Sequence, residues 1–149
     1  MDLAVDVQYA CGRKGVPGQQ RIVSWVRAAL GEREKPATLT VRIVGEPEGE
    51  ELNRRWRDCP HATNVLSFPG STSPHVVPEL LGDIVICRPV VEREAAGPGA
   101  GLDAHWAHLV VHGTLHLLGY DHENDREANV MERREVEVLS RLGYPDPYA

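Results

Sequence analysis

Three histidines in the C-terminal part of this 149-residue chain have the spacing of a metal site. His112 and His116 are four residues apart, and His122 follows Gly119 in the pattern H-x-x-x-H-x-x-G-x-x-H. Residues four apart on a helix share one face, so the first two imidazoles can reach the same ion. Gly119 can end the helix and reverse the chain, which brings His122 back toward the pair. Three neutral imidazoles leave one position open on a tetrahedral zinc ion, which is typical of a catalytic site.

Two further histidines precede this pattern on the same predicted helix. His108 is one turn before His112. It is eight residues from His116, a rise of about 12 Å, which ligand bonds of about 2 Å cannot bridge on one ion. We therefore expect His105 and His108 to lie on the helix surface or to support the ligands from behind.

Hydrophobic periodicity indicates which elements position these histidines. Alternating apolar residues predict four strands, at 3–9, 38–44, 64–68 and 81–87. Amphipathic spacing and Gly or Pro boundaries predict five helices, at 19–31, 47–57, from 89 to the break at 97–99, 103–118 and 124–142. Asp103 is the expected N-cap of the long helix. The Ser-, Pro- and Gly-rich stretch 69–79 is predicted to be a loop.

We therefore expect an α/β fold with one domain over residues 1–149. It has a small sheet of about four strands packed with about five helices, and the metal site lies at the end of the long helix. The length suits one hydrophobic core, and 42% hydrophobic with 26% charged residues is ordinary for a globular protein. No apolar stretch approaches the roughly 20 residues that span a bilayer, so we expect no membrane association.

Cysteine usage and the N-terminus indicate a cytoplasmic protein. Cys11, Cys59 and Cys87 are far apart and form no C-x-x-C pair. They are expected to be free thiols in a reducing compartment. The first residues carry acids and alternate in polarity, which predicts a strand rather than a targeting segment.

A short basic cluster, Arg54, Arg55 and Arg57, stands out in a chain of net charge −6. The acidic balance argues mildly against nucleic-acid binding, because neutralising phosphates favours a basic surface. A guanidinium group nevertheless suits a phosphodiester, since it stays charged and its fork bonds two phosphate oxygens. The alternative is that these arginines form a solvated helix face.

Four motifs follow one another in residues 38–142: Leu52-Asn53 with Trp56-Arg57, the segment 63–69 (TNVLSFP), the segment 81–84 (LGDI), and the histidine pattern of 112–122. Together with Met131 and Glu135, they resemble the YbeY family, bacterial zinc-dependent endoribonucleases associated with ribosomal RNA maturation. The resemblance implies a metal-dependent hydrolase whose single zinc ion is bound by His112, His116 and His122, with Arg57 as a nearby catalytic residue.

The resemblance also implies a substrate and partners. The expected substrate is single-stranded RNA, and the expected tasks are maturation of the 3′ end of small-subunit ribosomal RNA and ribosome quality control. The implied partners are the small ribosomal subunit and an assembly GTPase.

Several positions need a separate interpretation. Asn64 stands where many family members have Asp, and an amide cannot act as a base, so we assign it no proton transfer. Trp56 stands where Tyr or Phe is commoner. Asp83 either makes a capping or strand-end hydrogen bond or supports a zinc-bound histidine. Met131 is expected in the core, and Glu135 on the solvated face of a helix with charges of both signs.

Two other functions fit the same spacing. A zinc metallopeptidase with metzincin-like geometry would carry a Glu after the first histidine as general base, but this chain has Gly113 there. A non-catalytic ribosome-assembly factor with a structural zinc ion is the second alternative. For the endoribonuclease, either a zinc-activated water or the ribose 2′-hydroxyl could be the nucleophile.

Overall fold

The computed structural model describes residues 2–70, 80–97, 99 and 101–149. Its elements follow in the order β1 (Leu3–Tyr9), α1 (Gln19–Leu30), β2 (Ala37–Val44), α2 (Glu46–Arg57), β3 (Val65–Pro69), β4 (Leu80–Cys87), α3 (Arg88–Ala95), α4 (Leu102–Leu117) and α5 (Asp125–Arg141). This confirms the predicted α/β fold with a small four-stranded sheet, and the predicted bounds agree closely with those observed.

The four strands form one mixed sheet in the order β1-β2-β4-β3. β1, β2 and β4 run parallel, and β3 pairs antiparallel to β4 at the edge. Side chains alternate between the two faces, so Leu39, Val41 and Ile84 enter the main core while Val44 and Val85 belong to a smaller cluster on the other face. The second face is apolar only toward the carboxyl ends of these strands, because the polar side chains of Arg42 and Asp83 lie on it further back.

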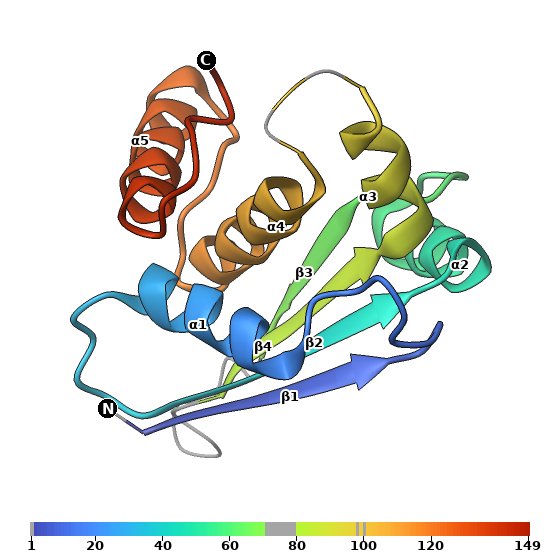
Figure 1. Cartoon of the computed structure of the whole chain (residues 1–149), viewed down its shortest axis with the longest axis horizontal. Coiled ribbons are helices and arrows are strands. Elements are labelled where there is room, and N and C mark those ends of the chain that lie inside the picture. Colours follow the sequence, from blue (N-terminus) through green and yellow to red (C-terminus); the bar gives the residue numbers. More distant parts are fainter. Residues whose placement is uncertain (1, 71–79, 98, 100) are drawn as a thin grey trace.

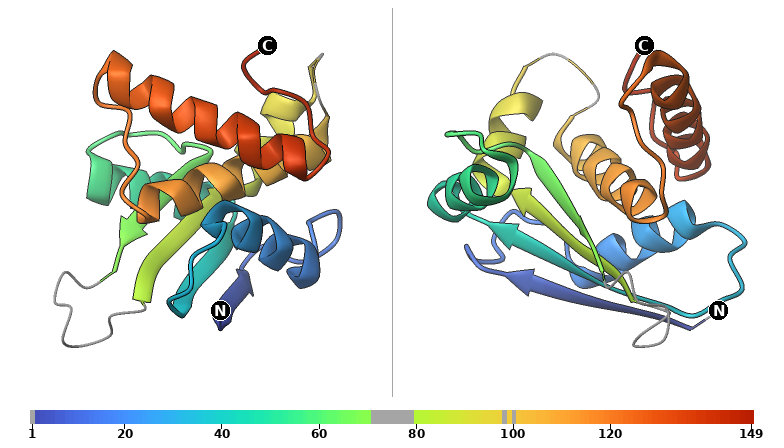
Figure 2. Two further views of the ribbon diagram at one scale, coloured as in Figure 1. Left: turned by 90° about the vertical axis from the view of Figure 1, so that its left-hand side faces the viewer. Right: turned by 180° about the vertical axis from the view of Figure 1, so that it is seen from behind.

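Helices cover one face of the sheet and part of the other (Figures 1 and 2). α1 and α4 pack on the face of the main core, and α5 lies outside them, against α4. α2 covers part of the opposite face, where Leu52 packs against the smaller cluster. Because α4 lies between the sheet and α5, it is apolar on several sides: Trp106, Val110 and Leu115 are fully buried. The helix that carries His112 and His116 is thus packed between the sheet and α5.

The close approach of α4 to β4 depends on Gly113. A Cβ atom at this position would lie 2.8 Å from Cγ2 of the buried Ile84. The hydroxyl of Ser67 in β3 also donates to the Gly113 carbonyl, at 3.3 Å. These contacts fix the middle of α4 against the edge of the sheet, so position 113 faces the sheet.

The structure differs from the predicted start of the long helix. α4 has Gly101 as its N-cap, without a side-chain capping bond, and Asp103 lies inside the first turn. The prediction of Asp103 as N-cap was wrong. A carboxylate in the first turn is nevertheless favourable beside the positive end of the helix dipole, and Asp103 also pairs with Arg21 at 3.4 Å.

Other predictions were confirmed or lie outside the described residues. Met131 is in the core, at 1% exposure. The cysteines are free thiols, and Cys87 is buried. Most of the predicted loop 69–79 lies outside the described residues, and Pro69 instead ends β3. Within the described part of the chain, no helix is long and apolar enough to cross a membrane.

Candidate metal centre

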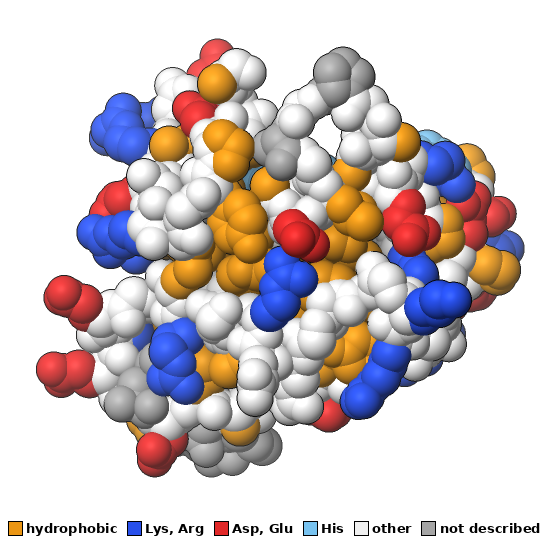
Figure 3. All heavy atoms as spheres, in the orientation of Figure 1, with side chains coloured by type: hydrophobic (Ala, Val, Ile, Leu, Met, Phe, Trp, Pro, Cys, Tyr) orange, Lys and Arg blue, Asp and Glu red, His pale blue; other side chains and the backbone are white. Residues whose placement is uncertain are grey.

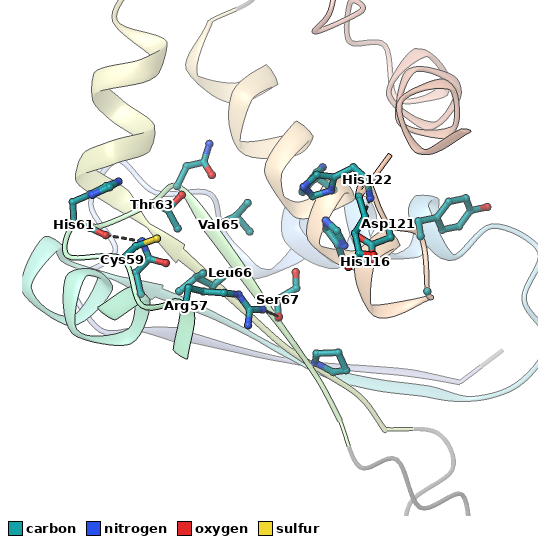
Figure 4. A pocket seen from close by; sticks show the side chains of 17 residues that line it. Arg57, Cys59, His61, Thr63, Val65, Leu66, Ser67, His116, Asp121 and His122 are labelled. Atoms are coloured by element: carbon teal, nitrogen blue, oxygen red, sulfur yellow. Dashed lines mark hydrogen bonds between the residues drawn. The ribbon is translucent and has the colours of Figure 1, made fainter. Parts of the chain in front are cut away.

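The fold brings the three predicted ligands together near the C-terminal end of α4. Figure 4 shows two of them, His116 and His122, side by side. His112 and His116 lie one turn apart, with ring centroids separated by 4.7 Å. Beyond the helix end, Gly119 has a φ of +105°, a conformation that only glycine adopts easily. The turn places the His122 ring 4.8 Å from that of His116 and 5.8 Å from that of His112. The predicted convergence of these side chains is confirmed.

The arrangement fits a transition-metal ion. Potential ligand atoms of the three histidines all lie within 4.8 Å of one another. Two nitrogens bound to one tetrahedral zinc ion lie about 3.3 Å apart, a spacing that small side-chain rotations would give. Burial, followed by the nearby His112 and His122, lowers the pKa of His116 and so favours the neutral imidazole that binds metals. Imidazole suits zinc, and also copper, iron and nickel.

A buried carboxylate behind His112 sets the orientation of its ring. Glu135 in α5 has no exposed surface. It accepts hydrogen bonds from His112 Nδ1, from the Tyr148 hydroxyl, and from His108 Nε2 at 3.0 Å. Burial alone would raise the pKa of Glu135, but these three hydrogen bonds outweigh it and hold the pKa at about 2. Because His112 Nδ1 donates to this carboxylate, its Nε2 is left for a metal.

The prediction that Glu135 lies on the solvated face of its helix was wrong. Met131, Glu135 and Val138 follow the spacing i, i+4, i+7, and all three are buried where α5 packs on α4. This spacing was visible in the sequence and could have identified the carboxylate as buried. A buried carboxylate needs partners, and the histidines of α4 are the nearest cations or donors.

His108 lies behind the predicted ligands, where it shares the Glu135 carboxylate with His112. This agrees with one of its two predicted roles, support of the ligands rather than a place on the helix surface. His108, His112 and Glu135 also place potential ligand atoms within 4.8 Å of one another. These groups are already hydrogen-bonded to each other, and neither His108 nor Glu135 lines the cavity that holds His112. We therefore interpret this second group as a hydrogen-bond network. His105 contacts Glu94, at 2.8 Å, and is not part of it.

A cavity of about 770 Å³ separates the histidines from β3 and the end of α2. Figure 4 shows His116 and His122 on one side and Arg57 and Ser67 on the other. Arg57 donates to the backbone carbonyls of Ser67, at 3.0 Å, and of Trp56, at 3.4 Å. Both acceptors are neutral, so the guanidinium charge stays available to an anion in the cavity.

The structure also places Asn64 and Asp83, two positions whose roles we interpreted individually from the sequence. Asn64 lines the same cavity and donates through its amide to Glu94, at 3.1 Å. Asp83 is exposed and lies on the opposite face of the sheet, because its neighbour Ile84 faces the main core. The interpretation of Asp83 as a support for a zinc-bound histidine was therefore wrong.

Charges of both signs are interspersed on the face that Figure 3 shows, with hydrophobic side chains between them. Although the net charge of the chain is −6, acidic side chains do not form a single patch on this face. Arg54, Arg55 and Arg57 lie in the last turn of α2, where cations are favourable beside the helix C-terminus.

Comparisons with known proteins agree with this site. The profile of the family described as Endoribonuclease YbeY matches residues 13–143. A protein of that name from Stutzerimonas stutzeri is 52% identical over 147 residues, covering 97% of this chain and 92% of the relative. Another from Xanthomonas campestris is 54% identical over 152 residues, covering 99% of this chain and 94% of the relative. The solution structure of TM1509 from Thermotoga maritima has a TM-score of 0.59 at 25% identity, covering 92% of this chain and 91% of that one.

Proposed function

Because the chain belongs to the YbeY family of endoribonucleases, we propose that it cleaves single-stranded RNA with the help of one zinc ion held by His112, His116 and His122. The observation that carries this proposal is the cavity itself, which has the three imidazoles on one side and Arg57 on the other. The proposed substrate is the 3′ end of small-subunit ribosomal RNA, in its maturation and in ribosome quality control. The proposed partners are the small ribosomal subunit and an assembly GTPase, in the cytoplasm.

The chain's own residues would bind and orient the phosphodiester. A zinc ion, when bound, would act as a Lewis acid and lower the pKa of a water molecule at its open position toward about 7. Arg57 would donate to the non-bridging phosphate oxygens and stabilise the negative charge that develops on them. Glu135 would keep His112 in the tautomer that presents Nε2. These roles suit either a water molecule or the ribose 2′-hydroxyl as nucleophile.

A peptidase of metzincin-like geometry is less consistent with the structure. That mechanism needs a carboxylate at the position of Gly113, next to the first ligand. Here Gly113 is buried against β4, with a hypothetical Cβ only 2.8 Å from Ile84. A glutamate side chain at this position would therefore clash with Ile84 in the core instead of pointing toward the metal.

Replacement of Arg57 tests the proposal. Arg57→Ala should keep its zinc and its fold, because the side chain is exposed and donates to the backbone carbonyls of Trp56 and Ser67. It should lose about a hundredfold in single-turnover cleavage of a short unstructured RNA, since one charged donor to a transition-state oxyanion contributes about 3 kcal/mol. Arg57→Lys should restore only part of the rate, because an ammonium lacks the planar fork.

The control is Arg54→Ala, which removes the same charge from a side chain that pairs with Glu51 instead. It should affect cleavage little, and less still at high salt. A wild-type rate in Arg57→Ala would remove Arg57 from the mechanism. RNA left uncleaved by the zinc-loaded wild type would favour the non-catalytic assembly factor, and zinc-dependent cleavage of a peptide would favour the peptidase.

A further inference from the structure

A second groove, of about 680 Å³, lies on the opposite face of the sheet. Its walls come from α2, from β3 and from the outward-facing residues of β1, β2 and β4. Arg57 and Pro69 line both this groove and the cavity of the histidines. The groove and the cavity therefore meet around the edge strand β3. An extended polymer ligand could pass from one to the other beside Arg57.

An exposed tryptophan forms one wall of this groove. Trp56 is 56% exposed, whereas Trp25 and Trp106 are buried at 2% and 1%. Phe68 meets the Trp56 ring edge-on, with centroids 6.3 Å apart, and the Arg55 guanidinium lies 5.5 Å from its centroid. The indole is thus held by its neighbours while much of its surface faces solvent. Nucleic-acid bases stack on aromatic side chains held in this way, and arginine adds a cation–π contribution.

The charges around the groove favour an anionic strand on the α2 side. Arg42 is neutralised by Glu48, at 2.6 Å. Among the described residues, the hydrogen bonds of Arg57 go to two neutral carbonyls, and its guanidinium lies 5.5 Å from the centroid of Phe68. Phosphates would therefore be bound near Arg57. The exposed carboxylate of Asp83 could accept a hydrogen bond from a ribose hydroxyl or a base amino group.

We propose that this groove binds a nucleotide adjacent to the cleaved phosphodiester, with its base stacked on Trp56, while Arg57 binds the cleaved phosphate where the groove and the cavity meet. This inference rests on the proposed function and deepens it. It also provides a physical reason for single-strand specificity: bases in a duplex are stacked on each other and cannot lie on an aromatic side chain.

The test is binding of a short unstructured RNA to the full chain, in the presence of a chelator so that the RNA stays intact. Trp56→Ala should weaken binding on the order of tenfold, and Trp56→Phe should retain most of the affinity. The control is Val130→Ala, which truncates another hydrophobic side chain that is 50% exposed and lies on α5. It should bind like the wild type. Zinc content and melting temperature of all variants should be unchanged.

Tryptophan fluorescence gives a second readout of the same contact. Because Trp56 is the exposed tryptophan, single-stranded RNA should quench the emission of the wild type, and the quenching should disappear in Trp56→Phe. A duplex of the same sequence should quench little. Wild-type affinity in Trp56→Ala would overturn the inference and leave the groove to a protein partner. Failure of the zinc-loaded enzyme to cleave RNA would instead overturn the proposed function, because binding is measured separately.

Discussion

Replacement of Glu135 by Gln would test whether the buried carboxylate contributes to metal affinity. Oε1 of Glu135 accepts from His112, and Oε2 accepts from both His108 and Tyr148. An amide of the same shape keeps one acceptor oxygen and places an NH₂ group where the other oxygen was. Because NH₂ cannot accept, either His112 or the pair of His108 and Tyr148 loses its acceptor.

The size of the effect follows from these contacts. A hydrogen bond to a charged group contributes about 1.5–3 kcal/mol, and His112 makes one such bond through Nδ1. Loss of an outer partner of a metal-bound histidine typically lowers metal affinity by about 10- to 100-fold. That factor corresponds to about 1.4–2.7 kcal/mol, so both estimates agree. We expect Glu135→Gln to bind zinc about 10- to 100-fold more weakly than the wild type.

The assay is competition for zinc between the protein and a chromophoric chelator. Glu137→Gln is the matched control, because it makes the same change on the same helix at a side chain that is 48% exposed and pairs with Arg134 and Arg141. It should bind zinc like the wild type. Equal zinc affinity in Glu135→Gln and Glu137→Gln would refute the role of the buried carboxylate.

Two further predictions concern stability without zinc. The pKa of Glu135 is about 2, below its unfolded value of about 4.3, so the stabilisation it provides is complete above about pH 5 and lost as the pH falls toward 2. This stabilisation is on the order of 3 kcal/mol. Denaturant titrations should therefore show that the difference in the free energy of unfolding between the wild type and Glu135→Gln narrows from pH 7 to pH 3. Gly113→Ala should place a Cβ 2.8 Å from Ile84 and cost about 1–2 kcal/mol net of the better helix propensity. Calorimetry should then show a melting temperature about 2–8 °C lower, whereas an unchanged value would contradict the close approach of α4 to β4.

The histidine arrangement could be predicted because all its determinants are local. His112, His116 and Gly119 lie within eight residues on one helix and its end, where helical geometry fixes their relation. Most secondary structure elements were predictable for the same reason, since their apolar periodicity and their Gly or Pro boundaries are local features of the sequence. Neither inference required knowledge of how the elements pack.

The environment of the site depends on packing between distant segments and was harder to predict. Glu135 reaches His112 only because α5 packs on α4, across 23 residues of sequence. Arg57, at the end of α2, lies across the cavity from the histidines and donates to the Ser67 carbonyl of β3. The place of β3 at the edge of the sheet, antiparallel to β4, was not indicated by the sequence pattern alone. Asp83 was assigned two roles, and only the sheet register shows that it faces away from the metal site.

Titration of the zinc-free protein with zinc tests the central claim most directly, with cleavage of a short unstructured RNA measured at each step. We expect cleavage to rise in proportion to added zinc and to level off at about one equivalent per chain. His116→Ala should stay folded but neither bind zinc tightly nor cleave, whereas His108→Ala should keep its metal. Full cleavage by the zinc-free wild type would contradict the account, as would loss of zinc in His108→Ala with retention in His122→Ala.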